Sequence, residues 1–215
     1  MIHTKSRTGA QALIAVVAAL VLLAASVAQA ATLANQNLTQ LITDSESIVE
    51  GTVKSVTDGI DENGLPYTEV TIAVNSTAKG NIEGETEYTF RQFGLLEPRT
   101  LEDGTILLTV SPAGFARWHE GESVIAFLHR PATRTGLQTT AGLAQGKLAR
   151  FDSNTLAANE FGNAGLFEGV WINPELTTPE EKNMLTTAGP VDAGTFMNLV
   201  HRAVFEQWIE NGEMR

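Results

Sequence analysis

Residues 47–56 read SIVEGTVKSV and residues 67–75 read YTEVTIAVN, and these two runs decide the fold. Apolar and polar residues alternate in both runs, which is the pattern of a β-strand with one buried face. Gly51 interrupts the first run, and a glycine inside a strand indicates a bend, a bulge or the close approach of another backbone. Between the runs, Asn63-Gly64 supplies the positive φ values that a tight hairpin needs. We therefore expect an antiparallel hairpin that can coil into a small barrel.

Five further runs predict strands, at residues 85–93, 105–110, 122–130, 137–141 and 146–151. The third of them contains VIAFL, a continuous apolar run that is typical of a strand covered on both faces. The stretch that follows these strands, up to residue 190, is rich in Asn, Gly, Thr and Pro. It predicts a loop-rich excursion whose isolated apolar side chains hold it against the sheet.

Helices are expected at both ends of the strand region. Residues 38–42 place three apolar side chains on one helical face, and Asn37 precedes them as an N-cap. Residues 192–210 repeat apolar side chains every three or four positions, which predicts an amphipathic C-terminal helix. Asp192 can cap this helix, and Gly212 can end it.

The first thirty residues have the organisation of a secretory signal peptide. Lys5 and Arg7 give a basic beginning, residues 13–27 are apolar, and Ala28-Gln29-Ala30 is a small-residue cleavage site. We expect cleavage near Ala31 and export to the periplasm or the extracellular space, with an uncleaved membrane anchor as the alternative. No later stretch approaches about 18 consecutive apolar residues, so we expect no membrane span after cleavage.

Charge and cysteine content exclude several functions. Without the two basic residues of the signal peptide, the chain has 12 basic and 25 acidic residues, a formal charge of −13. Nucleic acid is not an expected partner, because binding to phosphates depends on clustered Lys and Arg. The chain has no cysteine, which excludes disulfides, thiol catalysis and Cys-ligated zinc.

Four stretches carry a resemblance to a known group of proteins: SIVEGTV at 47–53, Thr68 and Val70 with Lys79-Gly80, GESVIAFL at 121–128, and GLAQGK at 142–147. In this order they resemble a group of uncharacterised exported bacterial proteins. Their pattern is similar to the OB-fold of netrin-like modules and of tissue inhibitors of metalloproteinases. Such inhibitors bind the target zinc through an N-terminal cysteine, which this chain lacks, so no inhibitory residue is carried over.

The resemblance implies a mainly β protein built on an OB-like five-stranded antiparallel barrel, with a short N-terminal helix and a C-terminal amphipathic helix. The expected organisation is a signal peptide at 1–30, the barrel domain at 31–151, the loop-rich excursion at 152–190 and the C-terminal helix at 191–215.

Motifs for catalysis, cofactors or metals are absent from the sequence. The loop at residues 59–64 lacks two principal ligands of a calcium loop, so a hairpin turn is the favoured interpretation. The mature histidines, His119, His129 and His201, lack the spacing of a zinc site. There is no G-x-S-x-G nucleophile motif and no phosphate-binding glycine loop. We therefore assign no catalytic residue, no metal ligand and no cofactor.

These observations predict an exported, non-catalytic binding or interaction module for a protein or glycan ligand. OB-like barrels bind on their second and third strands, which gives Tyr67, Glu69 and Arg91 as candidates. Trp118 and His119, in a polar and aromatic loop cluster, are added to them. Two alternatives stay open. One is a protease inhibitor or secreted hydrolase with its site in residues 93–118, and the other is a structural accessory that uses the apolar residues around Trp171.

Overall fold

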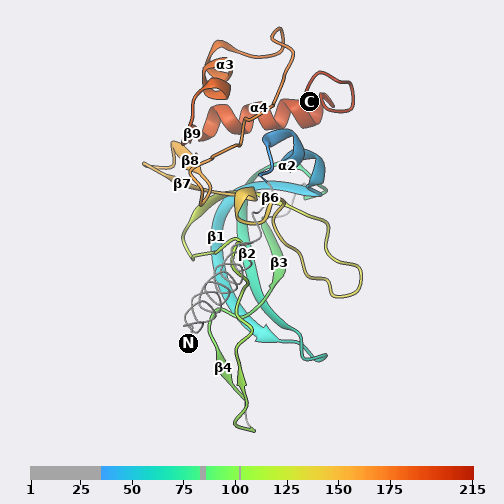
Figure 1. Cartoon of the computed structure of the whole chain (residues 1–215), viewed down its shortest axis with the longest axis vertical. Helices are drawn as coiled ribbons and strands as arrows, with labels where there is room; N and C mark the ends of the chain where they lie inside the picture. The colour runs from blue at the N-terminus through green and yellow to red at the C-terminus, as the bar shows by residue number, and fades with distance from the viewer. Residues whose placement is uncertain (1–34, 83–85, 102) are drawn as a thin grey trace, which may run out of the picture. The chain divides into compact units, whose positions relative to one another are not determined.

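A long, curved hairpin forms the centre of the fold (Figure 1). Its strands β1 (Ser47–Ile60) and β2 (Pro66–Lys79) have 14 residues each and pair antiparallel. The register between them shifts next to Gly51, and a Cβ built on Gly51 would lie 2.2 Å from the carbonyl oxygen of Ala73. Only glycine permits so close an approach of two backbones. The bulge and close approach expected at Gly51 are therefore confirmed.

The computed structural model describes residues 35–82, 86–101 and 103–215, and the signal peptide expected at 1–30 lies outside them. The described residues belong to a single unit, Asn35–Arg215. The other strands are β3 (Glu87–Phe93), β4 (Arg99–Thr100), β5 (Ile106–Leu107), β6 (Ser123–Leu128), β7 (Lys147–Phe151), β8 (Leu156–Ala158) and β9 (Val191–Asp192). Seven strands form one antiparallel sheet in the order β3-β2-β1-β6-β7-β8-β9, and β4 pairs with β5 in a separate sheet.

The mainly β class is confirmed. The described residues form a seven-stranded antiparallel sheet that does not close into a barrel, and the expected five-stranded OB-like barrel is not confirmed. β8 extends the sheet from the region where a loop-rich excursion is expected, and β9 extends it from the first two residues of the region expected as the C-terminal helix. Residues 137–141, expected as a strand, form two isolated bridges instead: Leu137 pairs parallel with Arg91, and Thr140 antiparallel with Leu128. They are not a continuous strand because their backbone hydrogen bonds are divided between β3 and β6.

Among the described residues, three α-helices accompany the sheet: α2 (Leu38–Asp44), α3 (Pro179–Thr186) and α4 (Ala193–Phe205). The caps expected at Asn37 and Asp192 are confirmed, since their side chains accept backbone hydrogen bonds from the first turns of α2 and α4. The C-terminal helix is shorter than expected and ends at Phe205, because Gln207 adopts a left-handed φ of 56°. α3 lies in the region expected to be a loop. A 3₁₀ turn, η1 (Leu143–Gly146), precedes β7.

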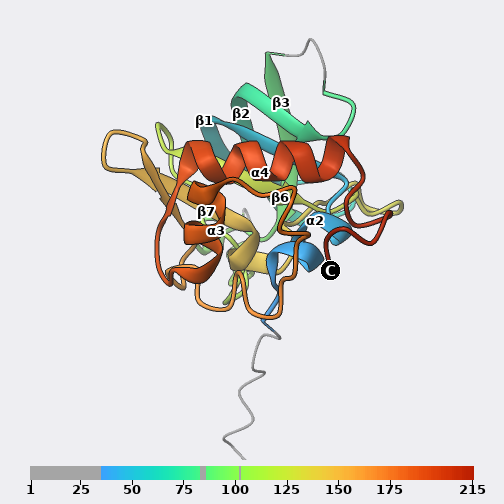
Figure 2. The same cartoon turned by 90° about the horizontal axis from the view of Figure 1, so that it is seen from above.

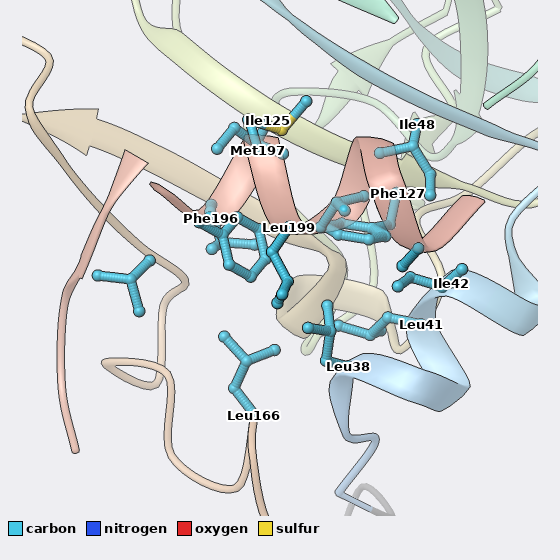
Figure 3. Close-up of a cluster of buried hydrophobic side chains, with 14 of the residues drawn as sticks. Leu38, Leu41, Ile42, Ile48, Ile125, Phe127, Leu166, Phe196, Met197 and Leu199 are labelled. Carbon is cyan, nitrogen blue, oxygen red and sulfur yellow. The ribbon is translucent and has the colours of Figure 1, made fainter. Parts of the chain in front are cut away.

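Two apolar clusters divide the core, and β6 separates them. The helix-side cluster lies between the sheet and the helices. Figure 3 shows Leu38, Leu41 and Ile42 from α2 close to Phe127 of β6 and to side chains of α4. Figure 2 shows α4 lying across the strands. The inner cluster lies along the curve of the long strands; its buried members are Val49, Val53, Val70, Ile72, Ile82, Phe90, Ala116, Trp118, Val124, Ala126 and Leu128.

Successive residues of β6 serve opposite clusters. Ile125 and Phe127 belong to the helix-side cluster, whereas Val124, Ala126 and Leu128 belong to the inner cluster. Side chains alternate across a strand, so a strand buried on both faces must be apolar throughout. The interpretation of VIAFL as a strand covered on both sides is therefore confirmed. Within the described part of the chain, no helix is both long and apolar enough to cross a membrane.

Candidate functional site

The structure brings three of the predicted site residues together on the β2–β3 pair. Glu69 lies opposite Arg91 in the strand register, and the Arg91 Nε donates a hydrogen bond of 2.7 Å to the Glu69 Oε2. The guanidinium carbon of Arg91 also lies 4.2 Å from the centroid of the Tyr67 ring. These contacts join neighbouring strands and stabilise their pairing. An exposed ion pair of this kind contributes about 0–1 kcal/mol to folding.

Trp118 and His119 lie elsewhere, in the loop that leads into β6, and they face different surroundings. The Trp118 ring is buried and meets Phe90 edge-on, with 5.2 Å between the ring centroids. Its Nε1 donates to the Oε1 of Gln92 at 3.4 Å. His119 is exposed, and its Nδ1 lies 3.8 Å from the Oε2 of Glu122. The predicted residues therefore form two groups, and the group of Trp118 and His119 lies at the cavities described next.

The first cavity beside this loop, with a volume of about 280 Å³, opens where the β4–β5 hairpin leaves the body of the protein. We call it the hairpin hollow. Figure 1 shows the hairpin extending away from the end that carries α4. Apolar side chains, including Leu95 and Trp118, form much of the wall. The lining residues are Thr68, Gln92, Leu95, Leu96, Val110, Ser111, Ala116, Arg117, Trp118 and His119.

The second cavity has a volume of about 300 Å³ and shares three wall residues with the first. We call it the Lys147 hollow, because a buried lysine helps to line it. Charged side chains from separate parts of the chain meet here. The lining residues are Ala116, Arg117, His119, Glu122, Ala144, Lys147, Ala149, Ala158, Asn159 and Glu160.

Lys147, the first residue of β7, is only 9% exposed. Its ammonium donates to the Glu122 Oε2 at 2.5 Å and to the backbone oxygen of Arg117 at 2.6 Å. The same nitrogen lies 5.3 Å from the centroid of the Trp118 ring, within the range of a cation–π contact. Burial lowers the pKa of Lys147 below its usual value, and the hydrogen bond and charge of Glu122 oppose this shift.

Neither hollow aligns a nucleophile with a base in the part of the chain that the structure describes. The hydroxyl of Ser111 donates to the backbone oxygen of Phe93 at 3.5 Å, whereas His119 lies beside Glu122. Covalent catalysis needs the nucleophile within hydrogen-bond reach of its base. Among the described residues, no group of three or more His, Asp or Glu side chains is placed to hold a metal ion. The described residues thus form two neighbouring cavities.

Sequence reasoning missed the charged residues of the Lys147 hollow. Lys147 closes the GLAQGK run, where it reads as part of a strand-and-turn pattern, and Glu160 lies in the stretch read as a loop. A lysine at the start of a strand is a weak signal by itself. Its partner Glu122 is 25 residues earlier in the chain, so only the fold brings the two together.

Comparison with protein-family models, with curated proteins and with solved structures finds no match to this chain.

Proposed function

We propose that the protein is an exported, non-catalytic interaction module that binds a protein partner at the hairpin hollow. The observation that carries the proposal is a set of exposed apolar side chains on the hairpin. Leu96 is 50% exposed, Ile106 61% and Leu108 72%. Apolar side chains gathered on a surface mark sites of contact with other proteins.

The exposed side chains are close together in the chain. Ile106, Leu108 and Val110 are exposed, whereas the residues between them are half-buried. β5 ends at Leu107, and the backbone then turns, since Val110 N donates to Leu108 O at 2.8 Å. Leu96 and Val110 also line the hairpin hollow, so the exposed apolar side chains continue into the cavity. A partner could thus place an apolar side chain in the hollow while covering the hairpin.

We also propose that the inner part of the sheet corresponds to an OB-like barrel whose two edges are bridged, but not closed, by residues 137–141. The support comes from the backbone of this segment, which reaches both edges of the β3-β2-β1-β6 array. Gln138 N donates to Arg91 O of β3 at 2.7 Å, and Ala141 N donates to Phe127 O of β6 at 2.8 Å. The strands that continue the sheet beyond β6 would then be additions to the barrel. Residues 93–118, where the inhibitor or hydrolase alternative has its site, include the hairpin. A protease is therefore one kind of partner that the hairpin could bind.

Site-specific photo-crosslinking tests the proposed partner. A photoreactive amino acid at Leu108 is expected to capture one protein from the exported fraction of the source organism. The same amino acid at Phe205, which is 89% exposed at the end of α4, is the matched control. Leu108→Ser should abolish binding of the captured protein and Phe205→Ser should preserve it. Equal capture from both positions would contradict the proposal.

If the captured protein is a protease, its inhibition can be measured with both forms of this protein. Inhibition by the wild type but not by Leu108→Ser would support the alternative in which the protein is a protease inhibitor. Export is tested separately. The N-terminus of the protein recovered outside the cytoplasm should begin near Ala31, and an intact Met1 would contradict cleavage.

A further inference from the structure

The Lys147 hollow has a different chemistry from the hairpin hollow. We propose that it binds a small organic zwitterion, a molecule of amino-acid size with one ammonium and one carboxylate group. This proposal concerns a second site and does not depend on the protein partner of the hairpin.

The floor of the hollow offers a hydrogen-bond donor. A lysine ammonium has three N–H donors. Lys147 uses one for the Glu122 carboxylate and one for the Arg117 backbone oxygen. Among the described residues, no third oxygen accepts from this ammonium, and its remaining contact is the Trp118 ring, 5.3 Å from the nitrogen. A hydrogen bond to a charged acceptor is stronger than a contact with an aromatic ring. A ligand carboxylate in the hollow would accept this hydrogen bond.

The wall offers one charge of each sign. Lys147 pairs with Glu122 on the floor, and Arg117 and Glu160 are the other charged lining residues. The negative charge of Glu160 also favours the charged form of Lys147. Neither Arg117 nor Glu160 takes part in an ion pair within the part of the chain that the structure describes. Arg117 can bind a ligand carboxylate through two parallel hydrogen bonds, and Glu160 can accept from a ligand ammonium.

Electrostatics favour a zwitterion over a simple ion. With Arg117, Glu122, Lys147 and Glu160 charged, the lining has no net charge while His119 is neutral. An anionic ligand would be attracted by Arg117 but repelled by Glu160, whereas a cationic ligand would be attracted by Glu160 but repelled by Arg117. A zwitterion can place its carboxylate beside Arg117 and its ammonium beside Glu160, so both residues attract it. It also avoids the repulsion that an anion would meet from a chain with a net charge of −11.

Small side chains create the space. Ala149 and Ala158 face one another across the β7–β8 pair, and Ala116 and Ala144 complete the apolar part of the wall. The volume of about 300 Å³ is at the lower end for small-molecule pockets, which limits the ligand to a few heavy atoms. The alanines would contact the methylene groups between the two charged ends of the ligand.

Isothermal titration calorimetry with a defined panel tests the proposal. The zwitterions are glycine, β-alanine and γ-aminobutyrate, whose charges are separated by increasing numbers of methylene groups. N-acetylglycine lacks the ammonium and glycinamide lacks the carboxylate. We expect at least one zwitterion to bind with a Kd below about 10 mM. Each blocked compound should bind at least about tenfold more weakly, because it forfeits one charged hydrogen bond.

Variants locate the binding. Arg117→Gln and Glu160→Gln should each weaken the best zwitterion about ten- to a hundredfold. The exposed pair Arg134→Gln and Glu175→Gln, which removes the same charges elsewhere, should leave the Kd unchanged. Ala158→Leu, which fills the hollow without altering a charge, should also abolish binding.

Three results would overturn the proposal. The first is that no zwitterion binds at about 10 mM, and the second is that N-acetylglycine or glycinamide binds as tightly as the zwitterions. The third is that the hollow variants and the control variants lose the same amount of affinity for the best zwitterion. None of these results bears on the hairpin, because Leu108 and Ile106 are not part of this cavity. Failure of one site is therefore distinguishable from failure of the other.

Discussion

The two hollows share Ala116, Arg117 and His119 but have opposite chemistry. Beyond this shared wall, the hairpin hollow continues into exposed leucine, isoleucine and valine side chains, whereas the Lys147 hollow is surrounded by charges. The shared segment does not make this difference, because Ala116, Arg117 and His119 line both hollows and only Trp118 lines the hairpin hollow alone. The difference comes from the residues that each hollow adds to this segment: Leu95, Leu96 and Val110 in the hairpin hollow, and Glu122, Lys147 and Glu160 in the Lys147 hollow.

Trp118 is the residue that both hollows depend on. Its ring lines the hairpin hollow, packs against Phe90 and lies beneath the ammonium of Lys147. Large aromatic side chains bury much area and fix the position of whatever packs against them. The comparison thus predicts that a substitution at a residue that lines a single hollow, such as Leu96 or Glu160, affects that hollow alone, while substitution of Trp118 affects both.

The largest expected effect is that of Trp118→Ala. Removal of this buried ring should lower the free energy of unfolding by about 3–5 kcal/mol, as measured by urea denaturation. Trp171→Ala is the matched control, because Trp171 is exposed and its ring contacts the guanidinium of Arg215. It should cost less than half as much. Similar losses for both variants would show that Trp118 does not hold the shared wall.

Lys147→Met should have the next largest effect. The variant keeps the volume of the side chain but leaves the partly buried Glu122 carboxylate without its cation. We expect a loss of about 1–3 kcal/mol in the free energy of unfolding at pH 7. The double variant Lys147→Met/Glu122→Gln should recover part of this loss, because it leaves no unpaired charge. If the double variant is less stable than Lys147→Met, pairing with Glu122 is not the main way in which Lys147 contributes to the free energy of unfolding.

The pH dependence of the free energy of unfolding shows whether burial of Lys147 or its pairing with Glu122 has the larger effect on the pKa of Lys147. Burial lowers the pKa of Lys147 in the folded protein below the usual 10.5. Between these two pKa values the unfolded chain binds more protons than the folded chain, so stability rises with pH. From pH 8 towards 10.5, the wild type should therefore gain stability relative to Lys147→Met in parallel urea titrations. A relative loss over this range would mean that pairing with Glu122 outweighs burial.

Leu108→Ser should have the smallest effect on folding. Because Leu108 is largely exposed, the free energy of unfolding should change by no more than about 0.5 kcal/mol. The same variant should no longer bind the protein partner, so we expect Leu108→Ser to abolish binding while leaving the stability of the fold almost unchanged. Thermal unfolding of the variant beside the wild type measures the stability change. A loss comparable to that of Lys147→Met would show that Leu108 packs within the fold instead of serving an interface.

Local signals in the sequence were sufficient for the central hairpin and the helix caps. Gly51 indicates a close backbone approach by itself, and Asn37 and Asp192 precede apolar helical runs, so these predictions need no distant contact. α3 has a signal that could have been used, since Thr178, Pro179 and Glu181 form a capping box with proline at the helix start. β8 and β9 have three and two residues, which is too short to show periodicity.

The candidate sites also include contacts that the sequence predicts and contacts that only the complete fold reveals. The meeting of Glu69 with Arg91 follows from antiparallel pairing of neighbouring strands. The Lys147 hollow could not be predicted, because Arg117, Lys147 and Glu160 come from three segments that only the complete fold brings together. The exposed apolar side chains of the hairpin were also missed, because exposed and buried leucines look alike in a sequence.

The most direct test of the division between the hollows is to titrate the best-binding zwitterion into three proteins: the wild type, Leu108→Ser and Arg117→Gln. We predict the same Kd for the wild type and Leu108→Ser, and a Kd about ten- to a hundredfold weaker for Arg117→Gln. Equal Kd values for all three proteins, or equal weakening in both variants, would contradict the separation of the two sites.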